Sequence, residues 1–253
     1  PVKKTTSRYT PGDDRAIRKI PEWFEYEGDG YLSRHSTLES NGDSLVDSYA
    51  RIYELSGSRM QVLPARHSLS IVGSDKNLLI KQDTVSYIAC QSPVISGRWY
   101  VPATVTSHDG GGRVQSTKEI LIRDDYGNPI EIVTNHSEHV IYLWGYYGQR
   151  LVAQIKGATY VEVENALGTS PVSLSQLFSP VSTISGLQAR LPGAQVYTYT
   201  YHPYAGVDRE TAPNGQTTCY DYDAKGRLVK SYRTGENGKQ EILQLNNYHI
   251  INE

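Results

Sequence analysis

Apolar and polar residues alternate along most of the chain, which is the pattern of half-buried β-strands. Residues 217–222 alternate in this way, and residues 227–232 alternate again after a short polar segment. Successive side chains of a strand point to opposite faces, so Tyr220 and Tyr222 are expected to share one face. Residues 223–226 predict a type I turn, in which Asp223 accepts from the backbone and Gly226 adopts the left-handed conformation. This stretch therefore predicts a β-hairpin that carries aromatic side chains and no catalytic group.

The same alternation predicts further strands in both halves of the chain. The candidate strands are residues 68–72, 78–80, 84–88, 99–105, 118–122, 130–133, 140–144 and 151–155, with a last strand at 243–251. Residues 46–55 fit a short helix as well as a strand, and the polar, basic residues 1–20 are expected to be mobile or extended. We divide the chain into an N-terminal β-rich region with a polar leading segment, 1–117, and a second β region, 118–253.

Between residues 158 and 192 the apolar period changes from 2 to 3.6, which predicts three short helices. Thr159 and Glu162 form a capping box, and Gly168 ends the first helix. Proline at the first position marks the start of the second helix. The residues expected to face inward are Tyr160, Val163 and Leu167 in the first helix, Leu174, Leu177 and Phe178 in the second, and Ile184, Leu187 and Leu191 in the third. The predicted fold is therefore mainly antiparallel β, with a helical insertion at 158–192 packed on one sheet face or one edge.

The motif Tyr220-x-Tyr222-Asp223-x-x-Gly226-Arg227-Leu228 resembles the YD repeat, also called the Rhs repeat. Three looser copies precede it. They are centred on Asp124 and Gly127, on residues 142–148 with Gly148, and on residues 197–206. The amino-acid sequences of residues 142–151, 158–163 and 197–201 are also similar to C-terminal regions of large YD-repeat proteins from the Bacteroidetes.

The resemblance implies a sheet of repeated hairpins in a secreted or cell-surface protein of the bacterial envelope. In that family such repeats coil into a hollow shell around a toxic C-terminal cargo, or act in adhesion. The copies here are too few to close a shell, so an open sheet is expected, continued by upstream repeats of the same polypeptide. We therefore expect a non-catalytic structural or interaction module that binds a protein or glycan partner.

Composition changes this picture little. The net charge of −2 over 253 residues argues against nucleic acid as a partner, and no apolar run is long enough to span a membrane. The 20 tyrosines against 2 phenylalanines suit half-exposed sheet faces, where the ring packs and the hydroxyl stays in water. The same rings could stack on sugars. The residues of this alternative glycan platform are Trp144, Tyr146 and Tyr147, with Trp99 and Tyr100 as a second cluster.

Candidate chemistry is sparse. His136 and His139 lie where a turn is expected, and a solvated turn is favoured over a metal site. Asp124 and Asp125 could hold calcium, but turn residues are favoured. Cys90 and Cys219 leave both a disulfide and two free thiols open. No catalytic or phosphate-binding motif is present, so neither an enzyme nor a cofactor is expected, and a hydrolase with dispersed catalytic residues is the less favoured alternative.

Overall fold

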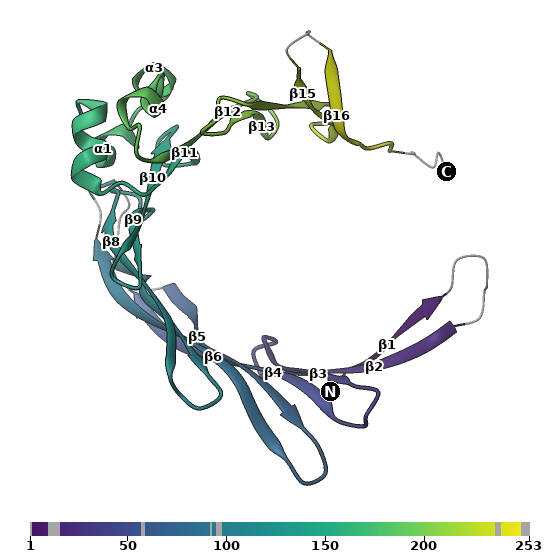
Figure 1. Ribbon diagram of the computed structural model, residues 1–253. Helices are drawn as coiled ribbons and strands as arrows, with labels where there is room; N and C mark the ends of the chain where they lie inside the picture. Colours follow the sequence, from purple (N-terminus) through teal and green to yellow (C-terminus); the bar gives the residue numbers. More distant parts are fainter. Residues whose placement is uncertain are drawn as a thin grey trace. The chain divides into compact units, whose positions relative to one another are not determined.

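The computed structural model describes residues 2–9, 16–56, 59–91, 93–94, 98–235 and 239–248. Its strands form one antiparallel sheet, in which the order of strands follows the chain from β1 to β16 (Figure 1). The strands are β1 Val2–Tyr9, β2 Ala16–Tyr26, β3 Leu32–Leu38, β4 Ser44–Ser56, β5 Arg59–Val72, β6 Asn77–Gln91, β7 Arg98–Asp109, β8 Val114–Arg123, β9 Pro129–Thr134, β10 Glu138–Gly145, β11 Arg150–Lys156, β12 Gln195–Tyr201, β13 Val207–Thr211, β14 Thr217–Tyr222, β15 Leu228–Thr234 and β16 Gln240–Leu245. The mainly β fold with a few short helices is thus confirmed.

Some element boundaries differ from those predicted. Residues 46–55 belong to strand β4, which pairs with β5 along its length, so the helix alternative is wrong. Residues 2–9 and 16–20 are extended, and residues 2–9 of β1 pair with residues 16–24 of β2. The predicted last strand at 243–251 is also wrong in its bounds, since β16 ends at Leu245 and residues 249–253 lie outside the described part of the chain.

The chain divides into two compact units. Unit 1 comprises residues 1–92, 96–119 and 134–136, and unit 2 comprises residues 93–95, 120–133 and 137–253. The division predicted at 117/118 stays a prediction. Among its described residues, unit 1 buries the apolar side chains of Val46, Leu63 and Val101 alone, so both faces of its strands remain largely half-exposed.

The large apolar core lies in unit 2, between the sheet and the helices α1 Tyr160–Leu167, α2 Pro171–Leu174, α3 Val181–Ile184 and α4 Leu187–Arg190. Figure 1 shows these helices gathered beside β10 and β11. The core residues from the sheet include Ile130, Ile141, Leu143, Ile155 and Val196. Because β11 and β12, which the insertion connects, pair directly with each other, the helices cover a sheet face and not an edge.

The first two helices begin and end where their capping residues predict. The Thr159 hydroxyl accepts from the Glu162 amide while the Glu162 carboxylate accepts from the Thr159 amide, which completes the capping box. Gly168 ends α1 with a φ of 71°, and Ser170 caps α2 ahead of Pro171. Val163 and Leu167 are buried, and Tyr160 packs against them, as their spacing predicts.

Two details of the insertion differ from prediction. The segment predicted as a third helix forms two helices, α3 and α4. The helical conformation is interrupted at Ser185 and Gly186, and Gly186 has a left-handed φ of 67°. Leu177 and Phe178 do not face inward: 43% and 69% of their surfaces are exposed. Helix α2 ends at Leu174, so the helical period no longer applies to the two residues that follow.

The hairpin at Asp223 has the turn that the motif predicts. The Gly226 amide donates to the Asp223 carbonyl at 2.9 Å, and Gly226 has a φ of 74°. The amides of Lys225 and Arg227 both donate to Asp223 Oδ1 at 2.9 Å. One carboxylate therefore satisfies two backbone donors of a type I turn followed by a left-handed residue.

The same geometry occurs at two further aspartates. Asp124 accepts from the amides of Tyr126 and Asn128, and Gly127 has a φ of 86°. Asp109 accepts from the amides of Gly111 and Arg113, and Gly112 has a φ of 80°. The glycine-rich segment 109–112 is thus another Asp-x-x-Gly turn, and its spacing in the sequence already matches the other two.

Three other turns have the same backbone hydrogen bonds but place the capping side chain at the third position. Asp29, Asn41 and Asn214 each accept from the amide two residues on, and each precedes a glycine with positive φ. This second capping mode replaces the first-position aspartate and keeps the turn closed. It shows that an Asp or Asn at either position can build these hairpins.

The residue before the turn pairs with the residue after it, as in Tyr222 with Leu228 and Tyr26 with Leu32. The turn at 202–206 has the same register, with Tyr201 opposite Val207. The segment Tyr26-Glu27-x-x-Gly30-x-Leu32 therefore matches the motif in unit 1, with Glu in place of Asp. Sequence analysis missed this copy because the acidic residue differs.

The two remaining predicted copies depart from the motif. At 197–206 the fourth turn residue is Ala205, and Gly206 lies one position later, where a Cβ atom would meet the Tyr222 hydroxyl. At 142–148, Gly148 ends a run of three residues with positive φ instead of closing an Asp-x-x-Gly turn.

Candidate interaction surface

The loop between β10 and β11 holds the backbone in an unusual conformation. Tyr146, Tyr147 and Gly148 have φ values of 54°, 58° and 73°. Two consecutive aromatic residues in the left-handed region are uncommon, and each costs conformational energy that surrounding contacts must offset. Here the Gly148 amide donates to the Ser175 carbonyl at 2.8 Å, and its carbonyl accepts from the Asn128 amide group at 2.7 Å.

This conformation presents two tyrosine rings to Phe178. The Tyr146 ring meets Phe178 edge to face with centroids 6.0 Å apart, and the Tyr147 ring is tilted against it at 6.1 Å. Tyr147 is 51% exposed and Phe178 is 69% exposed. These two rings form the exposed aromatic pair of unit 2. Phe178 was missed as a surface residue because the helical period was extended beyond the end of α2.

A layer of contacts supports the exposed pair from the sheet side. Tyr146 is half-buried and meets Tyr201 edge to face at 5.9 Å. The Tyr201 hydroxyl donates to the Leu151 carbonyl at 2.6 Å, and the Arg150 guanidinium lies 4.7 Å from the Tyr201 ring centre. Burial raises the pKa of Tyr201 above its ordinary value, so this hydroxyl stays a donor at neutral pH.

Trp144 does not lie in the exposed pair. Its indole N–H donates to the Pro129 carbonyl at 2.8 Å, and its half-buried ring packs against the apolar core. In the described part of the chain no ring contact joins Trp144 to Tyr146 or Tyr147. Trp144 therefore has a structural contact that accounts for it without a ligand.

Trp99 and Tyr100 lie in unit 1 on strand β7, opposite Cys90 and Ala89 of β6. Both are half-buried. As successive residues of a strand, they point to opposite faces of the sheet, so they cannot form one stacking platform.

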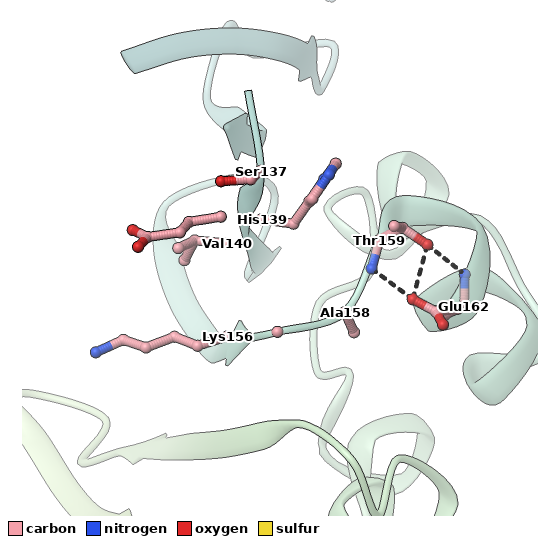
Figure 2. A pocket seen from close by; sticks show the side chains of 9 residues that line it. Ser137, His139, Val140, Lys156, Ala158, Thr159 and Glu162 are labelled. Atoms are coloured by element: carbon pink, nitrogen blue, oxygen red, sulfur yellow. Dashed lines mark hydrogen bonds between the residues drawn. The ribbon is translucent and has the colours of Figure 1, made fainter. Parts of the chain in front are cut away.

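Unit 2 has a pocket of about 450 Å³, lined by residues 137–140 at the start of β10, residues 156–159 between β11 and α1, and Glu162 of α1. Figure 2 shows these lining residues. His139, one of the lining residues, pairs with Glu131, whose side chain is only 7% exposed. Glu131 Oε1 is 2.8 Å from His139 Nδ1 and accepts from the Tyr160 amide at 3.2 Å. The carboxylate thus connects the sheet to the first amide of α1, which the helix leaves without a partner of its own.

The groups in this pocket do not form a nucleophile–base pair. Ser137 and His139 point in different directions, and the Thr159 hydroxyl is held by Glu162 at 2.9 Å (Figure 2). Hydrogen bonds from the Thr159 amide and hydroxyl lower the pKa of Glu162, so this group stays ionised and does not serve as a general acid at neutral pH. The arrangement fits a capped helix start.

The two histidines of segment 136–139 have different partners. His136 lies in a turn with Asn135, where both residues have positive φ, and its Nδ1 is 3.0 Å from Glu119. His139 lies on β10 and pairs with Glu131. Among the described residues no group of three His, Cys, Asp or Glu side chains could hold a metal ion. Asp124 caps its turn, the role expected of a turn residue, and Asp125 accepts from the Gln176 side chain at 2.5 Å.

The tyrosines of the C-terminal hairpins hold neighbouring strands together. The Tyr222 hydroxyl donates to the Val207 carbonyl at 2.8 Å, and the Tyr220 hydroxyl donates to Glu210 at 3.2 Å. Burial, reinforced by the Glu210 charge, raises the pKa of Tyr199 to about 12. Cys90 and Cys219 are both free, half-buried thiols.

No protein-family model matches the chain, and no curated protein matches its sequence. Among solved structures, the crystal structure of TcdB2-TccC3-TEV is 10% identical with a TM-score of 0.34, over 90% of this chain and 12% of that one. TcdB2-TccC3 without its hypervariable C-terminal region is 9% identical with a TM-score of 0.34, over 88% of this chain and 15% of that one. The Photorhabdus luminescens Tc holotoxin pore is 8% identical with a TM-score of 0.22, over 96% of this chain and 20% of that one.

The chain thus spans between about an eighth and a fifth of the length of these toxin chains. TM-scores in this range do not establish a shared fold. No helix of the described residues has the length and apolar character that a membrane crossing requires.

Proposed function

We propose that this chain is a non-catalytic structural module of a larger, secreted or cell-surface YD-type repeat protein. The observation that carries the proposal is the recurrent five-residue turn, which joins strands in chain order into a single sheet. In a chain built in this way, most residues form repeated hairpins, and the sheet presents an extended surface. In such a protein, the module would contribute strands to a sheet continued by further repeats.

The buried and turn-capping carboxylates support this proposal, because each one accepts hydrogen bonds from the backbone of the fold. Asp109, Asp124 and Asp223 cap turns, and Glu131 anchors the start of α1. Catalysis needs a nucleophile or an acid–base pair within reach of one reacting atom. In the pocket of Figure 2, His139 pairs with Glu131, and Ser137 and Thr159 are not directed at this pair.

An activity screen tests the proposal. The purified chain is incubated with chromogenic ester and glycoside substrates and with single- and double-stranded nucleic acids, beside a His139→Ala variant. We expect no turnover above the buffer rate with either protein. Turnover by the natural sequence that the His139→Ala variant loses would contradict a non-catalytic role, whereas turnover shared by both would identify a contaminant or a site elsewhere on the chain.

Glycan binding is a second candidate function, favoured by one observation: Tyr147 and Phe178 expose neighbouring rings. Exposed rings stack on the apolar faces of sugars. A glycan array probed with the natural sequence and with Phe178→Ala decides this. Saturable binding that Phe178→Ala removes, and that Tyr204→Ala retains, would support a glycan site at this pair; Tyr204 is the control because it is exposed and lies outside the pair.

A further inference from the structure

Unit 1 carries a row of alternating acidic and histidine side chains across neighbouring strands. The row comprises Glu22 on β2, His35 on β3, Asp47 on β4, His67 on β5 and Asp83 on β6, and we call it the acid–histidine ladder. His35 lies directly opposite Asp47, and His67 lies directly opposite Asp83, so these pairs share one face of the sheet.

The distances make the ladder continuous. His35 Nε2 is 3.3 Å from Glu22, and His35 Nδ1 is 3.7 Å from Asp47. His67 Nε2 is 2.8 Å from Asp47, and His67 Nδ1 is 3.9 Å from Asp83. Each imidazole therefore lies between carboxylates of the two adjacent strands, with one nitrogen toward each.

Aromatic rings lie against both imidazoles. Phe24 stacks on His35 with ring centres 4.6 Å apart, and Tyr49 stacks on His67 at 5.0 Å. An imidazolium above an aromatic face gains cation–π attraction. Burial, followed by the nearby Asp47 charge, raises the pKa of Tyr49, so this ring stays neutral over the range in which histidines change charge.

Other charged groups lie at the two ends of the ladder. Lys81 Nζ is 2.9 Å from Asp83, and Lys4 lies opposite Glu22 in the register of β1 and β2. The Ser107 hydroxyl donates to Asp83 at 2.5 Å. Asp47, in the middle, has His35 and His67 as its ion-pair partners in the described part of the chain. Its charge is balanced only when these imidazoles are protonated.

We propose that the acid–histidine ladder makes the pairing of β3, β4 and β5 depend on pH, so that these strand pairs are more stable under mildly acidic conditions. Histidine is the side chain that ordinarily changes charge between about pH 5 and pH 8. A protonated imidazole on each side supplies the positive charge that balances Asp47. With neutral imidazoles, three carboxylates lie in one row, and repulsion along the row weakens the strand pairs.

Hydrogen–deuterium exchange of the full chain tests the proposal. Protection of peptides from β3 to β5, corrected for the intrinsic exchange rate, is measured at about pH 6 and pH 8. We expect protection to be higher at the lower pH by about two- to fivefold, the size of an effect from partly exposed ion pairs. Peptides from β15 in unit 2, a strand without histidine, serve as the internal reference.

Three variants decide the cause. The His35→Gln/His67→Gln double variant should lose the pH effect, and Asp47→Asn should lose it also, which keeps the test valid if the double variant does not fold. His202→Gln should retain it, because His202 is an exposed histidine of unit 2. An equal pH effect in the natural sequence and the ladder variants, or protection that falls from pH 8 to pH 6 in the natural sequence, would overturn the proposal.

Discussion

At the scale of single residues, the fold depends on the glycine that closes each repeated turn. Gly226 has a φ of 74°, a conformation that costs other residues about 1–2 kcal/mol. Gly226→Ala should therefore lower the free energy of unfolding by this amount, measured by urea denaturation.

Gly193 offers a matched control in the same unit. Its φ is not in the left-handed region, and an added Cβ would meet no atom within 4 Å. Gly193→Ala should leave the unfolding free energy unchanged or raise it slightly, since alanine restricts the unfolded chain. Equal losses in both variants would show that the conformation of Gly226 is not what matters.

The capping aspartate predicts a pH dependence of stability. Hydrogen bonds from the amide and side chain of Arg227 lower the pKa of Asp223 below its ordinary value of 3.8. A carboxylate with a depressed folded-state pKa stabilises above its unfolded pKa, and this contribution is lost as pH falls through the folded value. The urea midpoint of the natural sequence should fall more steeply between about pH 5 and pH 2.5 than that of Asp223→Asn. If the urea midpoints of the natural sequence and Asp223→Asn fall equally steeply with pH, Asp223 does not have this role.

At the scale of elements, the helical insertion is held by a small number of buried side chains. Leu174 is fully buried, whereas Leu177 is 43% exposed. Leu174→Ala should lower the unfolding free energy by about 2–5 kcal/mol. Leu177→Ala should lower the unfolding free energy by less than about 1 kcal/mol, because the Leu177 side chain is already largely outside the core. Similar costs for the two variants would contradict the outward position of Leu177.

Local signals predicted the elements whose chemistry is local. Thr159, Gly168, Ser170 and Pro171 fix the ends of α1 and α2 through contacts within a few residues. The strand at 46–55 could not be decided from its own residues, since its conformation comes from pairing with β5. The break at Gly186 and the outward turn of Phe178 likewise depend on packing.

At the scale of the whole molecule, the fold class could be predicted from the sequence, but one copy of the repeat could not be identified. Asp223 and Gly226 carry the motif in full, whereas Glu27 and Gly30 carry it with one acidic residue replaced by another. The exposed aromatic residues were harder to predict, because exposure is a property of packing. Trp144 donates its indole proton to Pro129, and Phe178, which was expected to be buried, is exposed.

Repeated five-residue turns place consecutive strands side by side in one defined register. Nuclear Overhauser contacts in the deuterated, methyl-labelled chain measure this register. We expect contacts between Tyr222 and Leu228, between Tyr201 and Val207, and between Tyr26 and Leu32, the pairs that flank three of the turns. Contacts that pair these tyrosines with residues of non-consecutive strands, or a helical pattern of contacts in 195–234, would contradict this order of strands.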